Sequence, residues 1–250
     1  QSGRLSHINV GSWNDVGIDP VMTKKTKESL IDWCYAAVTF QALKGKRVVV
    51  FGHDSMGMET ALPHVSATRN QFGIEITRLD MKLLSDMLTK KSYDERELLK
   101  LKKWIKSNCL KIEIPKETDE DNLDKSLALY LIVRDMMKEL NAVGGGFMSQ
   151  LEWGSDSRGI PLPVADIMES LFNSTFDHNG PKEVIPYATE ADVQALLTQL
   201  FMTWLSGGNP PLFMDFRKVW EPYEIKEFAK QNKVKLSGKS IWEKKGFVCL

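Results

Sequence analysis

Two acidic residues, Glu190 and Asp215, stand where an enzyme could place reactive groups. Glu190 follows the predicted strand 184–187, and Asp215 ends the apolar run 212–214 within the predicted strand 212–216. Ligands of open α/β sheets bind beyond the carboxyl ends of the strands, so both carboxylates are predicted to face such a site. A carboxylate pair there can bind a divalent metal through hard oxygen ligands, or it can move a proton.

Each acid also has a simpler interpretation. A Thr-Glu step such as Thr189 and Glu190 before a helix commonly caps that helix or interacts with its dipole. An Asp close to an Arg, as Asp215 is to Arg217, commonly forms a surface ion pair. Residue type and spacing therefore leave metal binding, proton transfer and these structural roles open.

Two glycine-containing segments also lie at predicted strand exits. Glycines 144–146 lead to Gln150, whose amide could hydrogen-bond a polyol if the backbone approaches a ligand there, and a flexible turn is the alternative. Segment 52–58 has neither the G-x-G-x-x-G spacing of dinucleotide sites nor the Gly-Lys-Ser/Thr of a phosphate-binding loop. We therefore predict no nucleotide site, and a turn rather than a ligand contact at His53 and Asp54.

The histidines and cysteines show no metal-binding spacing. His7, His53, His64 and His178 lack any H-E-x-x-H pattern and are predicted to be structural or solvent-exposed. The cysteines at 34, 109 and 249 form neither a metal motif nor a disulfide framework, which favours a reducing, cytoplasmic compartment.

The hydrophobic pattern predicts an α/β protein in which strands and helices alternate. Strands are expected at 47–51, 73–77, 141–148, 184–187 and 212–216, with the third broken by its glycines. Helices are expected at 21–44, from 54 onward, and at 80–90, 92–109, 118–140, 161–171 and 191–205, and Ser92 to Glu95 fits a capping box. The fold class is a Rossmann-like, open and mostly parallel sheet flanked by helices.

The Gly-Gly-Asn-Pro-Pro segment at 207–211 is the strongest chain breaker. It predicts a Rossmann-like domain over 1–206, with a helical lead-in at 1–45, and a truncated start of a C-terminal domain over 207–250. The chain begins with Gln1 and stops at Leu250 without a tail, so we expect it to be a piece of a longer protein.

Charge and hydropathy exclude two classes of partner. The 250 residues carry 33 basic and 33 acidic side chains, a net charge of zero, which argues against nucleic-acid binding through bulk electrostatics. No apolar run approaches the roughly 18 residues of a membrane-spanning helix, and no apolar signal region follows the N-terminus.

Several motifs taken together, in order, resemble those of the L-fucose isomerase family. Residues 51–58 are similar to its G-x-x-S-M-G-M segment, and residues 70–75 to its Q-F-G turn. Residues 173–180 are similar to N-S-S-F-D-W-N-G, residues 188–192 to A-T-E-x-D, and residues 215–220 to A-D-V-R-x-x-W.

The resemblance implies an aldose–ketose isomerase that interconverts a sugar such as L-fucose or D-arabinose with its ketose. It implies Rossmann-like N-terminal domains, a β-rich C-terminal domain and a homo-oligomer. The metal, typically Mn²⁺, would be held by Glu190 and Asp215, which are also the proton-transfer groups, and Gln150 would contact the sugar. The family's third ligand, a His, is expected outside this chain, so this piece is expected to bind metal weakly and catalyse little. A non-catalytic sugar-binding or regulatory α/β domain is the alternative.

Overall fold

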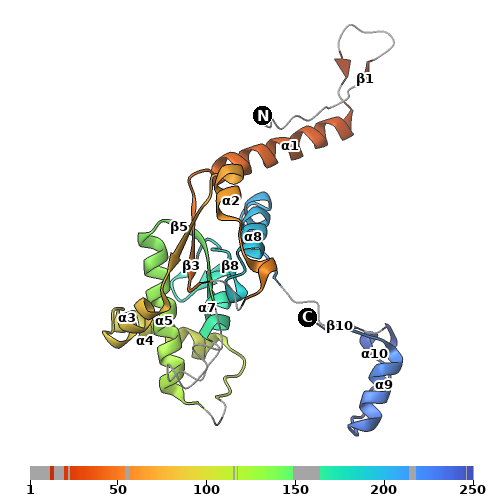
Figure 1. Ribbon diagram of the computed structural model, residues 1–250. Coiled ribbons are helices and arrows are strands. Elements are labelled where there is room, and N and C mark those ends of the chain that lie inside the picture. The colour runs from red at the N-terminus through yellow and green to blue at the C-terminus, as the bar shows by residue number, and fades with distance from the viewer. Residues whose placement is uncertain are drawn as a thin grey trace. The chain divides into compact units, whose positions relative to one another are not determined.

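The computed structural model describes residues 12–13, 20–21, 23–53, 57–114, 116, 118–148, 164–213, 218–245 and 247–249. Its centre is a four-stranded sheet made of β3 (Arg47–Phe51), β4 (Glu75–Leu79), β5 (Ala142–Phe147) and β8 (Tyr187–Ala188). All pairings in this sheet are parallel, and the strand order is β4-β3-β5-β8 (Figure 1). The predicted open, parallel α/β sheet is confirmed.

The valine run of β3 explains why the sheet is covered on both faces. Successive side chains of a strand point to opposite faces. Val49 and Phe51 belong to one buried cluster, and Val48 and Val50 pack on the opposite side in two smaller ones. A strand that is apolar at every position must bury both faces, which is the pattern of parallel sheets.

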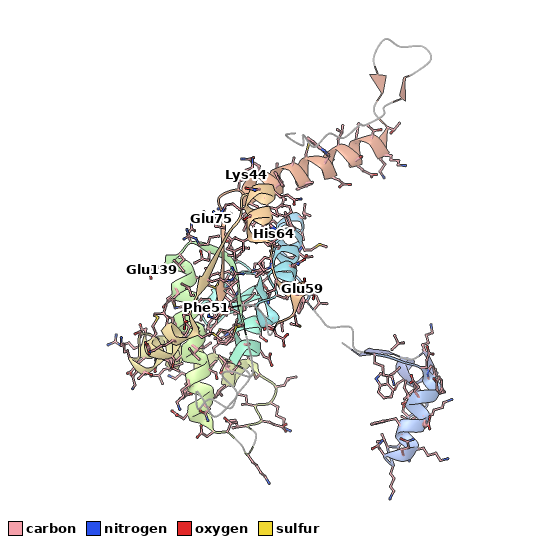
Figure 2. All side chains as sticks on the ribbon, viewed as in Figure 1. Lys44, Phe51, Glu59, His64, Glu75 and Glu139 are labelled. Atoms are coloured by element: carbon pink, nitrogen blue, oxygen red, sulfur yellow. The ribbon has the colours of Figure 1, made fainter. Side chains whose placement is uncertain are left out.

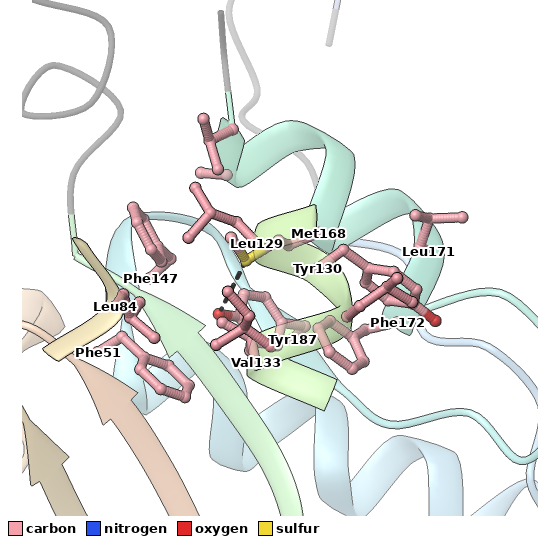
Figure 3. Close-up of a cluster of buried hydrophobic side chains, with 14 of the residues drawn as sticks. Phe51, Leu84, Leu129, Tyr130, Val133, Phe147, Met168, Leu171, Phe172 and Tyr187 are labelled. Atoms are coloured by element: carbon pink, nitrogen blue, oxygen red, sulfur yellow. Dashed lines mark hydrogen bonds between the residues drawn. The ribbon is translucent and has the colours of Figure 1, made fainter. Parts of the chain in front are cut away.

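The larger core lies beneath four helices: α3 (Met81–Thr89), α4 (Glu95–Asn108), α5 (Glu120–Glu139) and α7 (Val164–Phe172). Figure 3 shows aromatic side chains filling the space between the sheet and these helices. The rings of Phe172 and Tyr187 stack with their centroids 4.8 Å apart. Packing of Phe172 and Tyr187 therefore fixes α7 against β8.

The opposite face is covered by α1 (Lys24–Leu43), α2 (Val65–Phe72) and α8 (Val193–Leu205). The ring of Phe72 makes edge contacts with Phe40 and with Phe201, so the three helices meet at one aromatic cluster. Helices on both faces make the sheet doubly wound.

β5 differs from its prediction because its three glycines do not break it. Gly144, Gly145 and Gly146 pair in register with Val48, Val49 and Val50 of β3. All three are buried, and a Cβ at any of them would lie within 3.1 Å of a neighbouring atom. The three glycines are therefore needed for close packing within the sheet, and they form neither a flexible turn nor a site of ligand approach.

The segment after β3 also differs from its prediction. Of the helix expected from residue 54, residues 54–56 lie outside the described residues, and the described part holds a single 3-10 turn, η1 (Glu59–Ala61), followed by α2. Leu62 is extended, at φ −78° and ψ 127°, because the residue before a proline avoids helical conformations. α2 then starts with the Nδ1 atom of His64 accepting from the Ala67 N–H, so this histidine is structural, as predicted.

Two other local predictions need correction. α4 is capped by Asp94, whose carboxylate accepts from Arg96 and Glu97, rather than by a box that starts at Ser92. The strand predicted at 184–187 is reduced to β8. Pro186 has no N–H to donate, although its carbonyl accepts from Gly145.

The chain divides into two compact units, 1–211 and 212–250. The second contains the antiparallel strands β9 (Lys218–Trp220) and β10 (Phe247–Cys249) and the helices α9 (Pro222–Gln231) and α10 (Ile241–Lys245). Of the strand predicted at 212–216, residues 212 and 213 lie in no strand, and 214–216 lie outside the described residues.

The first unit also holds two short hairpins. One is β1 (Ser12–Trp13) with β2 (Pro20–Val21), and the other is β6 (Phe176–Asp177) with β7 (Gly180–Pro181). Among the helices that the structure describes, none combines the length and apolar character needed to cross a membrane.

Candidate functional site

The carboxyl ends of β3, β5 and β8 lie next to one another at one edge of the sheet. Figure 2 marks this edge by Phe51, the last residue of β3, and the opposite edge by Glu75, the first residue of β4. Beyond this edge, the Met148 N–H donates to the Phe51 carbonyl at 2.9 Å. In doubly wound sheets this is the edge at which ligands bind.

The chain leaves β3 through a close backbone approach. Gly52 has φ +110°, and a Cβ there would lie 2.4 Å from the Cβ of Met148. His53 is exposed, and its N–H reaches the Met148 sulfur at 3.0 Å. A glycine is therefore required at position 52 by close packing against Met148, the residue that follows β5. The exposed His53 side chain belongs to no buried group of ligands among the described residues.

Glu190 lies directly beyond β8, at the same edge, in the 3-10 turn η2 (Thr189–Ala191). Its backbone is left-handed, with φ 54° and ψ 23°, and Ala191 follows with φ 55°. Residues other than glycine rarely adopt this backbone conformation, and such strained residues cluster at functional sites. The turn departs from the helix start that the sequence predicted there.

Helix capping does not account for Glu190. The side chain that caps α8 is Asp192, whose Oδ1 accepts from the Ala195 N–H at 2.9 Å. The capping role that residue type left open for Glu190 therefore belongs to Asp192.

A second carboxylate, Glu169 of α7, lies beside this turn. Its Oε2 accepts a 2.6 Å hydrogen bond from the Thr189 hydroxyl, and its Oε1 is buried with no partner among the described residues. Burial, together with the negative charges of Asp166 and Glu190, raises the pKa of Glu169 to about 7 against the lowering effect of the Thr189 hydrogen bond.

Sequence reasoning missed Glu169. Its signal is an acid at an inward position of an apolar helix, in the run Val-Ala-Asp-Ile-Met-Glu-Ser-Leu-Phe. Buried carboxylates are uncommon and usually paired, so an inward Glu in such a helix indicates a polar neighbour.

The other site residues predicted from the sequence cannot be placed. Asp215 and Gln150 lie outside the described residues. Within the described ranges, no group of three or more His, Cys, Asp or Glu side chains is arranged to hold a metal ion.

The potential metal-ligand atoms at the edge are nonetheless all carboxylate oxygens. Glu190, Glu169 and Asp166 offer carboxylate oxygens, and one of them, Oε1 of Glu169, is a buried acceptor with no described partner. Hard divalent ions such as Mn²⁺ prefer oxygen ligands. Carboxylate oxygens are the ligand type that such an ion takes, and because the described residues alone form no metal-binding group, a site here would need further ligands.

The motif at 173–180 forms a separate polar cluster. The His178 side chain is fully buried, and its Nε2 lies 3.0 Å from Oε1 of Glu97. Glu97 also pairs with Arg134, whose Nη2 donates to Oε2 at 2.8 Å, and accepts from Asn179. This network ties the β6–β7 hairpin to α4 and α5, so His178 is structural, as predicted.

Fold and edge together define the class: a doubly wound α/β domain that presents carboxylates beyond the carboxyl ends of its parallel strands. Residues 46–207 match the family model described as L-fucose isomerase, second N-terminal domain. The chain therefore belongs to the L-fucose isomerase family.

Curated relatives agree with this assignment. The L-fucose isomerase of Clostridium perfringens (strain 13 / Type A) is 27% identical over 237 residues, which cover 83% of this chain and 39% of that protein. The L-fucose isomerase of Salmonella choleraesuis (strain SC-B67) is 27% identical over 236 residues, which cover 85% of this chain and 39% of that protein. The chain thus spans about two fifths of the length of these relatives.

Proposed function

We propose that this chain supplies part of the active site of a metal-dependent aldose–ketose isomerase, with a sugar such as L-fucose or D-arabinose as substrate. The observation that carries the proposal is the placement of Glu190. It lies at the ligand-binding edge of a family domain, in a strained turn, with its capping role taken by Asp192. We further propose that Asp215 and Gln150 join it, as metal ligand and sugar contact, and that a histidine from outside these 250 residues completes the ligand set.

The reaction requires a proton to leave C2 of the aldose and to be returned to C1 through an enediol, while the hydroxyl oxygen on C2 loses a proton and the oxygen on C1 gains one. Glu190 and Asp215 would hold a divalent ion, which would supply positive charge to stabilise the negative charge that develops on the sugar oxygens. A carboxylate at the edge, Glu190 or Asp215, takes the proton from C2 and delivers it to C1. Gln150 orients the sugar by hydrogen bonds to its hydroxyls. We also propose a cytoplasmic homo-oligomer, as the family resemblance implies.

Mn²⁺ titration followed by NMR tests the metal site in this chain, because a paramagnetic ion broadens nearby amide signals even when binding is weak. We expect selective broadening of the amides of 188–192, and its loss in Glu190→Gln. Glu139→Gln is the matched control, because Glu139 is exposed at the end of α5, near the opposite edge of the sheet (Figure 2). Broadening that is absent, or that persists in Glu190→Gln, would rule out Glu190 as a ligand.

A metal-independent sugar-binding domain is the outcome that would replace this proposal. Calorimetry with L-fucose and with D-arabinose, with and without Mn²⁺, separates the two. Sugar binding that does not change with the metal would favour a binding or regulatory domain, and binding that appears only with Mn²⁺ supports the isomerase.

A further inference from the structure

Glu169 is a carboxylate to which the proposed reaction assigns no role. It lies on the apolar helix α7, between Met168 and the buried Leu171 and Phe172. Its Oε1 is shielded from solvent and has no partner among the described residues. Burying a carboxylate oxygen without a hydrogen-bond partner costs free energy.

The other oxygen of Glu169 holds the residue next to Glu190. Oε2 of Glu169 accepts from the Thr189 hydroxyl at 2.6 Å. Thr189 is the first residue of the turn that contains Glu190. The bond therefore connects this turn to α7, although Glu169 and Thr189 are twenty residues apart in sequence.

The turn needs such support because its conformation is unfavourable. Glu190 and Ala191 are both left-handed, at φ 54° and 55°. Two consecutive left-handed residues without glycine persist only where the surroundings hold them. Ala191 rests on Gly146, where a Cβ would come within 2.9 Å of its Cα. Ala191 is also buried against Val50 and Val193, and the Asp192 N–H donates to the Thr189 carbonyl at 3.0 Å. The bond from the Thr189 hydroxyl to Glu169 ties the turn to α7.

We propose that Glu169 is a positioning residue for Glu190: its hydrogen bond to Thr189 holds the 189–191 turn in the conformation that presents the Glu190 carboxylate at the edge of the sheet. That Glu190 then binds a metal rests on the proposed function. The positioning itself does not, because it is a property of the turn.

The test compares variants that keep or remove the hydrogen bond. Glu169→Gln keeps an acceptor and Thr189→Ser keeps a donor, whereas Glu169→Leu and Thr189→Val remove one partner each. In each folded variant, the ¹³Cα and ¹³Cβ chemical shifts of Glu190 and Ala191 report whether the backbone stays left-handed. We expect the left-handed shifts to persist in the Gln and Ser variants and to move toward averaged values in the Leu and Val variants.

Mn²⁺ affinity is the second readout, measured from the broadening of the amides of 188–192. Loss of a residue that orients a metal ligand typically weakens metal binding by about 10- to 100-fold. We expect about a tenfold loss in Thr189→Val and Glu169→Leu, and near wild-type affinity in Thr189→Ser and Glu169→Gln.

The two readouts separate the two ideas. Left-handed shifts that persist in both Thr189→Val and Glu169→Leu would overturn the positioning role, whatever the metal does. Shifts that respond as expected in a chain whose wild-type amides show no Mn²⁺ broadening would support the positioning role and refute the proposed metal site.

Discussion

Ala191 packs so closely on Gly146 that a Cβ at position 146 would lie 2.9 Å from the Ala191 Cα. The same Cβ would lie 3.2 Å from the Ala188 carbonyl oxygen. The turn that contains Glu190 therefore packs closely against β5, and this packing is possible because Gly146 has no side chain.

Gly146→Ala should destabilise the chain by about 1–3 kcal/mol, because the added methyl must displace backbone rather than a flexible side chain. Urea unfolding measures this. Gly207→Ala is the control, because it adds the same methyl where nothing lies within 4 Å, at the cost of a left-handed φ of +75° alone. Gly146→Ala should also shift the ¹³C signals of Glu190, and Gly207→Ala should not. A Gly146→Ala variant with wild-type stability would refute the close packing.

Asp192→Ala should cost about 1 kcal/mol, the usual value of a lost N-cap, because Asp192 caps α8. Glu190→Gln should cost less than Asp192→Ala, because the Glu190 side chain does not cap that helix. Thermal or urea unfolding of the two variants decides the point. A larger cost for Glu190→Gln than for Asp192→Ala would return Glu190 to a structural role.

Glu169 should make stability fall as pH rises through neutrality. Its folded pKa of about 7 lies above its ordinary value of 4.5, so the folded state holds a proton that the unfolded state has lost. The contribution of Glu169 to the free energy of unfolding is therefore highest below pH 4.5, falls by up to about 3 kcal/mol as pH rises from 4.5 to about 7, and levels off above pH 7.

The measurement is urea unfolding of wild type and Glu169→Gln between pH 5 and 8, in chelator to remove metal. The stability of wild type relative to Glu169→Gln should decrease across this range. A difference that does not change with pH would show that Glu169 titrates normally.

Glu97 should have the opposite pH dependence. Hydrogen bonds from Arg134, and then from Asn179 and His178, lower its pKa to about 2 against the effect of burial. A lowered pKa stabilises the fold above the ordinary value of 4.5, and the contribution is lost as pH falls toward 2.

Arg134→Met should therefore reduce stability more at pH 6 than at pH 3, as measured by urea unfolding. Arg69→Met is the control, because Arg69 and Glu75 are exposed and 3.9 Å apart, and such pairs contribute little at any pH. Equal losses at both pH values for Arg134→Met would mean that the arginine acts through packing alone.

The sheet could be predicted because burial leaves a clear pattern in the sequence. The continuous β-branched run of β3 marks a strand covered on both faces, and Glu190 could be placed at its edge because it follows an apolar run. The glycine triplet was misinterpreted because its cause is tertiary: Leu196, Tyr187 and Ala191 each approach one of the three glycines.

Glu169 was not predicted for the same kind of reason. It is twenty residues from Thr189 in sequence, and the two meet only because α7 packs against β8 through Phe172 and Tyr187. The left-handed turn at Glu190 also gave no signal, since it contains no glycine. Local propensity does not report conformations that packing imposes.

The most direct test of the account is the rate at which the protein that carries this chain converts L-fucose or D-arabinose to its ketose with Mn²⁺ present. The account predicts that Glu190→Gln lowers this rate at least about 100-fold, the contribution expected of a proton-transferring carboxylate, while Glu139→Gln leaves it unchanged. A Glu190→Gln protein that turns over at the wild-type rate would contradict the account.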